Sequence, residues 1–138
     1  MHVLKIAFAV LLAAFAALPA RAAEPARSSA ATQFTQDIPN IPGKKFLQLI
    51  LTYPPGAKSP PHRHAKSAFI YAYVLEGQVR SQVDDAAPKV YGVGEYWHEN
   101  PGAHHRVSEN ASATQPAKVV VVMVLDASET VLTTPDPQ

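Results

Sequence analysis

Short β-favouring runs, separated by turn residues, dominate the chain from Phe46 onward and most constrain its fold. Each run ends at proline, glycine, asparagine or aspartate. The run 69–75 is rich in aromatic and β-branched residues, and 78–83 alternates polar and apolar side chains. No segment between the runs has the apolar spacing of an amphipathic helix. Seven runs are predicted as strands: 46–53, 69–75, 78–83, 89–93, 95–99, 105–108 and 118–125. The pattern predicts an all-β domain, either a sandwich or a barrel.

The run 118–125, Lys-Val-Val-Val-Val-Met-Val-Leu, is the most apolar of these segments. Its apolar residues do not alternate with polar ones, as they would in a strand with one solvated face. A continuous apolar run of this length is typical of a strand buried on both faces. We therefore expect residues 118–125 to lie at the centre of a sheet.

Length, charge and cysteine content exclude several classes of protein. A chain of 138 residues has room for one domain. Twelve Lys and Arg residues against eleven Asp and Glu residues give a net charge of +1, which provides no basic surface for nucleic acid. The absence of cysteine excludes disulfides, iron–sulfur clusters, thiolate-bound zinc and a thiol nucleophile.

The N-terminus has the three regions of a secretory signal peptide. Lys5 gives a positive start, 6–18 is an uninterrupted apolar run, and Ala20-Arg21-Ala22 follows Pro19 as a small-residue cleavage site. Thirteen apolar residues are too few to span a bilayer, which needs about 20. We expect cleavage after Ala22 and an exported protein, periplasmic or secreted, without a stable membrane anchor.

Composition divides the rest of the chain into three parts. Residues 23–40 are polar and alanine-rich, with little apolar periodicity, and are predicted to be a flexible lead-in. Residues 41–130 form the predicted β domain. The Pro-rich segment 131–138 is predicted to be a frayed tail. Edge strands of a small β domain invite pairing, so a homodimer is possible.

The histidines are unevenly placed in a way that suggests a metal site. His62 and His64 flank Arg63, and residues two apart in a strand project to the same face. His104 and His105 are adjacent, so only one of them can join that pair. A third imidazole from a distant strand would turn a His-x-His pair into a metal site. A surface pair of histidines is the alternative.

Two motifs resemble those of the cupin superfamily, whose fold is a small antiparallel β-barrel of jelly-roll type. In the first, Gly56 is followed after five residues by His62-Arg63-His64, and the segment closes with Tyr-Val-Leu-Glu-Gly at 73–77. In the second, Gly94 is followed after five residues by Asn100-Pro101-Gly102 and then by His105. The resemblance covers residues 46–125 and implies a single cupin barrel.

The chain departs from the family pattern at the glutamate of the first motif. Counting forward from His64 reaches Ala68 or Phe69, and counting back from Gly77 reaches Ile70, so both counts find an apolar residue. Changes in the second motif, Asn100 for proline and Glu109 for asparagine, are typical of loop variation. The missing glutamate alters the site itself, since no acid within the motifs is left to serve as a base.

The resemblance implies that His62, His64 and His105 bind one divalent transition metal ion. Imidazole suits Fe, Zn, Cu and Ni, the resemblance to cupin oxygenases adds Mn, and the sequence does not choose among these metals. Three neutral ligands leave the charge of the ion uncompensated, which favours an additional anionic ligand. We therefore expect a metal-dependent enzyme, dioxygenase-like, that acts on a small anionic or chelating compound. The alternatives are a non-catalytic cupin that binds or senses a small molecule or a metal, and a cupin that has lost its metal.

Five further residues are candidates for the lining of a ligand pocket, because small barrels can enclose one small molecule. They are Tyr71, Tyr73, Tyr96, Trp97 and His98. Aromatic residues on strands are more often part of the core, and His98 could equally lie exposed at an edge. The sequence identifies no catalytic residue.

Overall fold

The computed structural model describes residues 26–137, so the predicted signal peptide lies outside the described residues. The described residues contain eleven strands and no helix, and hence no helix long and apolar enough to cross a membrane. The strands are β1 (Ser29–Asp37), β2 (Lys44–Tyr53), β3 (Lys58–Ser59), β4 (His62–His64), β5 (Phe69–Glu76), β6 (Gln78–Val83), β7 (Lys89–Gly92), β8 (Tyr96–Glu99), β9 (His104–Asn110), β10 (Ala117–Asp126) and β11 (Thr133–Pro135).

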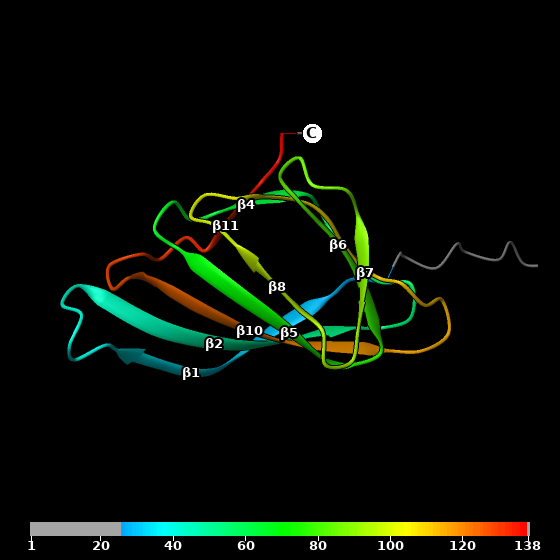
Figure 1. Ribbon diagram of the computed structural model, residues 1–138, viewed down its shortest axis with the longest axis horizontal. Helices are drawn as coiled ribbons and strands as arrows, with labels where there is room; N and C mark the ends of the chain where they lie inside the picture. The colour runs from blue at the N-terminus through cyan, green and yellow to red at the C-terminus, as the bar shows by residue number, and fades with distance from the viewer. Residues whose placement is uncertain (1–25, 138) are drawn as a thin grey trace, which may run out of the picture.

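The strands form two antiparallel sheets, shown in Figure 1. One sheet has the order β1-β2-β10-β5-β8. The other has the order β11-β4-β9-β6-β7, with β3 also paired to β9. Every pairing between named strands is antiparallel. The architecture is a jelly-roll barrel, and the predicted all-β class is confirmed.

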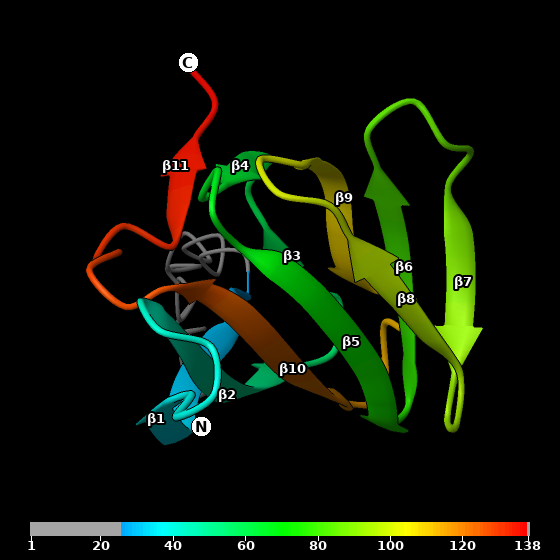
Figure 2. The ribbon, with the colours of Figure 1, turned by 60° about the vertical axis from the view of Figure 1, so that its left-hand side comes forward.

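Strand β10 occupies the centre of its sheet, between β2 and β5 (Figure 2). Its side chains nevertheless alternate in burial. Val119, Val121, Met123 and Leu125 are buried, whereas the intervening residues at 120, 122 and 124 are half-buried. One face of the strand packs into the core between the sheets, and the other lies on the outer side of its sheet. The predicted central position is confirmed, but the expected burial of both faces is wrong, because the outer face is only half-buried.

Both ends of the described chain are more ordered than the sequence indicates. Residues 29–37, within the predicted lead-in, form β1, which pairs with β2 from Ser29↔Thr52 to Asp37↔Lys45. All nine residues of β1 are exposed, so the strand is held mainly by its backbone pairing with β2. Its sequence therefore lacks the alternation of apolar residues from which a strand could be predicted. Residues 133–135, in the predicted frayed tail, form β11 on the edge of β4. Backbone pairing depends little on side-chain type, which explains both differences.

Gly77 lies at the corner where the chain passes from β5 in one sheet to β6 in the other. Its φ of +69° is in the left-handed region, which glycine adopts without strain. A Cβ atom there would lie only 2.2 Å from the carbonyl oxygen of Pro116. Glycine therefore sets the close approach of this corner to the start of β10, which fixes how the two sheets face each other.

Candidate metal centre

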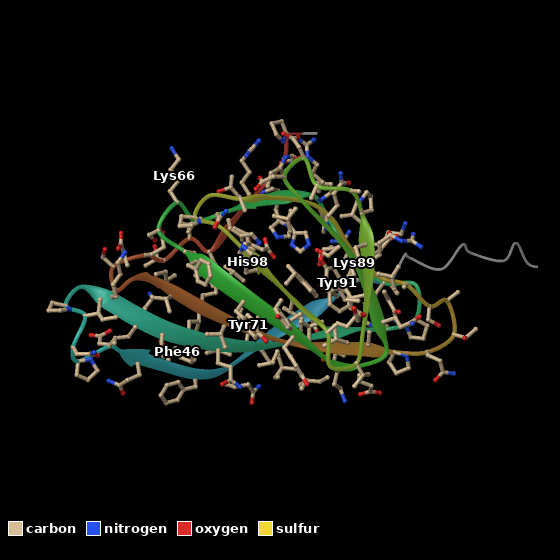
Figure 3. The ribbon with its side chains drawn as sticks, in the orientation of Figure 1. Phe46, Lys66, Tyr71, Lys89, Tyr91 and His98 are labelled. Carbon is tan, nitrogen blue, oxygen red and sulfur yellow. The ribbon has the colours of Figure 1, made fainter. Side chains whose placement is uncertain are left out.

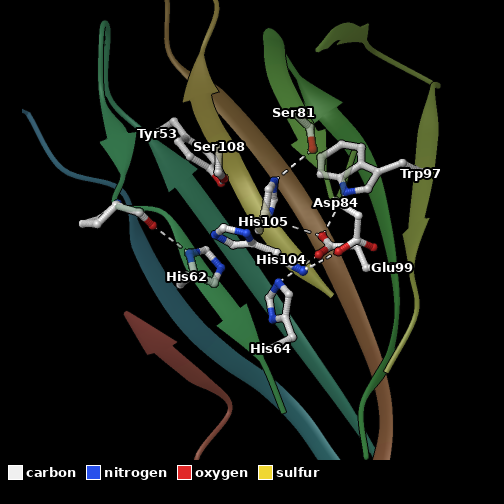
Figure 4. Close-up of polar contacts among 11 residues, drawn as sticks. Tyr53, His62, His64, Ser81, Asp84, Trp97, Glu99, His104, His105 and Ser108 are labelled. Atoms are coloured by element: carbon white, nitrogen blue, oxygen red, sulfur yellow. Dashed lines mark hydrogen bonds and ion pairs between the residues drawn. The ribbon is translucent and has the colours of Figure 1, made fainter. Parts of the chain in front are cut away.

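Three histidines converge on the inner side of the barrel (Figure 4). On the short strand β4, His62 and His64 share a face while Arg63 between them is exposed. Strand β9 pairs with β4 so that His62 lies opposite His105, which places their side chains on the same side of the sheet. One ligand nitrogen from each of the three lies within 4.8 Å of the others. The structure thus brings together the three histidines that the sequence singled out.

His104, the neighbour of His105, points away from this cluster. Its Nε2 lies 2.7 Å from Oδ2 of Asp136, just beyond β11, and its backbone N–H donates to Asp84. Strand alternation therefore separates the two adjacent histidines. One belongs to the cluster, and the other ties the C-terminal segment to the barrel.

A fourth residue of the cluster, Glu99 at the end of β8, was not identified from the sequence. Only 3% of its surface is exposed. Its Oε2 lies 2.9 Å from Nε2 of His64, and its Oε1 lies 3.4 Å from Nδ1 of His105. Oε1 also accepts a hydrogen bond of 3.0 Å from the indole N–H of Trp97. The site therefore contains a carboxylate, contrary to the expectation of three neutral ligands and no acid.

Glu99 reaches the site because β8 pairs with β5. Ile70 is the position that counting back from Gly77 assigns to the missing glutamate, and Ile70 is the direct cross-strand partner of Glu99. Directly paired residues in an antiparallel pair lie on the same face, so both side chains point inward. The carboxylate is supplied from the neighbouring strand. The alternation in Tyr96-Trp97-His98-Glu99 places Trp97 and Glu99 on one face, but strand pairing cannot be read from sequence alone.

Burial and charge set the protonation of the cluster. Desolvation lowers the pKa of His105 to about 4 and also lowers that of His62. Burial by itself raises the pKa of Glu99, but the contact with His64 and the attraction to His105 in its protonated form outweigh burial, and the net pKa is below the usual value. At neutral pH, His62 and His105 are therefore neutral and Glu99 is ionised. These are the forms in which imidazole and carboxylate bind metals.

The contacts of His62 and His105 each leave one ring nitrogen available to an ion. Nδ1 of His62 is 2.8 Å from the carbonyl oxygen of Pro60, which leaves Nε2 free. Nε2 of His105 is 2.9 Å from Oγ of Ser81, so Nδ1 is the nitrogen that faces Glu99. Such partners hold metal-binding histidines in a fixed orientation and tautomer.

His64 and Glu99 provide the test of whether these residues fit a metal. Their Nε2 and Oε2 atoms are 2.9 Å apart but are not aligned for a hydrogen bond, and neither atom has a hydrogen-bond partner among residues 26–137. Two ligand atoms that each bind one ion at about 2.0–2.2 Å lie roughly 3 Å apart. Three imidazole nitrogens and one carboxylate oxygen suit a divalent transition metal. The arrangement fits such an ion.

A cavity of about 230 Å³ opens against this cluster. Its walls away from the cluster are mainly apolar side chains from the strands and from the segment that leads into β11: Leu49, Leu51, Ile70, Ala72, Met123 and Leu132. Trp97, Tyr53, Ser28 and Thr133 also line it. The N-terminal and C-terminal segments of the described chain thus both contribute to its wall.

Of the five residues predicted as possible pocket lining, Trp97 lines this cavity and the other four do not. Tyr71 and Tyr73 lie on the outer face of β5, because Ile70, Ala72 and Val74 take the inner positions. Tyr71 and His98 are labelled in Figure 3; both are exposed. Tyr96 and His98, together with Trp97, border a second, more open hollow beside Lys89 and Tyr91. Both faces of this strand pair carry aromatic residues, so the sequence did not show which face turns inward.

The sequence of residues 49–123, more than half of the chain, matches the family model of the cupin domain. The chain belongs to the cupin family. Its two histidine-bearing strands and the barrel that holds them are the cupin fold, as the motifs at Gly56–His64 and Gly94–His105 predicted. None of the curated proteins compared with this cupin by sequence matches it.

Solved structures share the fold of this cupin at low sequence identity. The TT1209 protein of Thermus thermophilus is 22% identical with a TM-score of 0.58, over 72% of this chain and 84% of that one. Oxalate oxidase in complex with the substrate analogue glycolate is 21% identical with a TM-score of 0.60, over 79% of this chain and 56% of that one. The DMSP lyase DddQ of Ruegeria pomeroyi DSS-3 is 21% identical with a TM-score of 0.55, over 67% and 45%.

Proposed function

We propose that this protein is an exported, metal-dependent cupin enzyme, dioxygenase-like, that acts on a small anionic or chelating compound. One divalent transition metal ion, Fe, Mn, Zn, Cu or Ni, would be held by His62, His64, His105 and Glu99. The observation that carries the proposal is the buried carboxylate and three imidazoles at the wall of a partly open, mainly apolar cavity. Structures named as an oxalate oxidase and a DMSP lyase share the fold, which supports an enzymatic role.

Glu99 changes the charge balance from the one expected for three histidines alone. A divalent ion bound by three neutral imidazoles and one carboxylate retains one net positive charge. An anionic group of the substrate would neutralise it, so an anionic ligand is still favoured at the ion. When bound, the ion supplies Lewis acidity and, if it is iron or manganese, one-electron chemistry toward dioxygen.

The chain's own residues would orient the ligands and exclude water. Pro60 and Ser81 fix the rings of His62 and His105, and the indole N–H of Trp97 fixes the carboxylate of Glu99. The apolar walls of the cavity lower the local dielectric, which strengthens charge interactions at the ion. The site would thus present an ion to a small molecule in a mainly apolar space.

A non-catalytic binding or sensing cupin is the second candidate. Among the described residues that line the cavity, Tyr53 is the one titratable side chain outside the four-residue cluster. Its hydroxyl is 2.8 Å from Oγ of Ser108, and burial raises its pKa, so it stays protonated at neutral pH. A protein that only captures a ligand needs no further acid or base.

The first test is elemental analysis by mass spectrometry of protein purified from its native compartment without chelator. We expect near-stoichiometric metal in the wild type, loss of it in His105→Ala, and retention in the neighbouring control His104→Ala. Equal metal in the wild type and His105→Ala would contradict the site. Oxygen uptake by the metallated protein with candidate small molecules would support the enzyme, and ligand binding without turnover would support the binding cupin.

Export has its own test, since the signal peptide lies outside the described residues. The intact mass of the protein recovered from the periplasm or medium should correspond to a chain that begins at Ala23. A mass that includes Met1 would contradict cleavage after Ala22.

A further inference from the structure

The cavity beside the cluster carries almost no polar group that a ligand could use away from the metal site. Four of its six hydroxyl groups pair with one another: Tyr53 with Ser108, and Ser28 with Ser59. The other two belong to the exposed residues Ser29 and Thr133, and the remaining wall away from the cluster is aliphatic or aromatic. A ligand that fills the cavity therefore needs an apolar body and can place a polar group at one end only.

The charges around the cavity limit the charge of the ligand. Glu99 is the single acidic residue in its wall, and no lysine or arginine of the described chain lines it. A divalent ion with Glu99 leaves one positive charge, which one anionic group compensates. A second anionic group would be buried in the apolar part without a partner, and this is costly in a low-dielectric interior.

The size of the cavity limits the apolar body. At about 230 Å³ it is smaller than the pockets that hold drug-sized ligands, which begin near roughly 300 Å³. A dry apolar cavity of about 150 Å³ holds benzene. The space beside the ion is therefore enough for one ring or a chain of about six carbons.

We propose that the ligand of this site is a small monoanion with one oxygen-donor head and an apolar body, such as a medium-chain or aromatic monocarboxylate, and not a dicarboxylate. The inference rests on the proposed metal site. The anionic head would reach the ion, and the apolar body would lie against Leu51, Ile70 and Met123. The ligand class is thereby narrower than the anionic or chelating compounds that the sequence suggested.

Calorimetric titration of the exported protein, loaded with Co²⁺, tests this with hexanoate and adipate. The two ligands have the same carbon chain and differ in the second carboxylate. We expect hexanoate to bind at least 10-fold more tightly than adipate, oxalate and acetate, and to change the visible absorption of Co²⁺. Adipate or oxalate binding as tightly as hexanoate would overturn the proposal, as would hexanoate binding without a change in the Co²⁺ spectrum. A protein that retains no Co²⁺ would instead contradict the metal site, and the inference with it.

Two substitutions on one face of β10 give a matched control. Met123 lines the cavity, whereas Leu125, two residues along the same face, is buried outside it. Met123→Ala should enlarge the cavity and shift the preference from hexanoate toward decanoate by several-fold. Leu125→Ala should leave the chain-length preference unchanged, although it also removes core side-chain atoms. Equal shifts in the two variants would overturn the placement of the apolar body, and thermal unfolding of each variant verifies that it folds.

Discussion

The inner and outer faces of the β5–β8 strand pair both carry aromatic and ionisable residues, but the two faces have different roles. The inner face carries Ile70, Ala72, Trp97 and Glu99, all buried, and forms one wall of the cavity and one corner of the cluster. The outer face carries two contacts between aromatic rings. The ring centroids of Tyr71 and Tyr96 are 5.4 Å apart, and those of Phe69 and His98 are 6.0 Å apart. All four of these side chains are exposed.

The difference shows that residue type alone does not mark the functional face. Aromatic and ionisable residues stand on both sides of the strand pair, Trp97 and Glu99 inside, Tyr71 and His98 outside. What distinguishes Glu99 is the opposite sheet, which brings His64 and His105 within 2.9 Å and 3.4 Å of it. The candidate metal site lies on the face that the second sheet covers.

Substitution of one large aromatic on each face should give the largest contrast. Trp97→Ala should lower the free energy of unfolding by about 3–5 kcal/mol, because it removes a buried indole and the donor to Glu99. Tyr71→Ala should lower it by less than about 1 kcal/mol, because the ring is exposed. Equilibrium urea unfolding of both variants measures this. A similar loss of unfolding free energy in both variants would mean that side chains of the outer face stabilise the fold as much as buried ones do.

The protonation of the inner cluster should make the stability of the metal-free protein depend on pH. The pKa of His105 is near 6.5 in the unfolded chain and about 4 in the folded protein, so between these values the unfolded state binds more protons. Stability should be full above pH 6.5 and fall by up to roughly 3 kcal/mol as the pH drops toward 4. The lowered pKa of Glu99 acts in the same direction.

Urea midpoints at pH 7.5 and pH 4.5 measure this effect. His105→Asn should flatten the dependence, whereas His98→Asn, on the outer face, should leave it as in the wild type. If the urea midpoint of His105→Asn changed with pH as much as that of the wild type, a group other than His105 would cause the pH dependence of stability.

Loss of the carboxylate of Glu99 on the inner face should weaken metal binding, and in free energy this effect should be smaller than the two preceding effects on stability. Glu99→Gln should weaken metal binding by about 10- to 100-fold, because a neutral amide replaces an ionised ligand beside three imidazoles. The outer-face control His98→Ala should bind metal as the wild type does. Competition with a metallochromic chelator measures both.

Exchange of the two paired residues sharpens this comparison. The double variant Ile70→Glu with Glu99→Ile moves the carboxylate to the opposite strand on the same inner face, since the two residues are direct partners. It should recover part of the affinity lost in Glu99→Gln. A double variant no better than Glu99→Gln would show that the position on β8, beside Trp97, is required.

The smallest effect should come from the exposed aromatic pair. Tyr96→Ala should cost about 0.5–1 kcal/mol of stability through its contact with Tyr71 and should leave metal affinity unchanged. Thermal unfolding and the same chelator competition measure the two quantities. A change in metal affinity would mean that the outer face reaches the site after all.

The sequence by itself determined the all-β class, seven of the eleven strands (β2 and β5–β10) and the three histidines. These features are local. Strand alternation places His62 and His64 together and separates His104 from His105, and turn residues divide the runs. The third histidine, His105, came from the resemblance to the cupin motifs. Local pattern alone could not identify it, because it depends on the pairing of β4 with β9, which are far apart in sequence.

The tertiary structure alone decided the rest of the site. Glu99 joins the cluster because β8 pairs with β5, and Ile70 stands opposite it. β1 and β11 form because free strand edges accept backbone hydrogen bonds whatever the side chains are. Tyr71 faces outward because the second sheet covers the other side of β5. Cross-strand pairing and the choice of buried face depend on contacts between residues far apart in sequence, so a local pattern does not contain them.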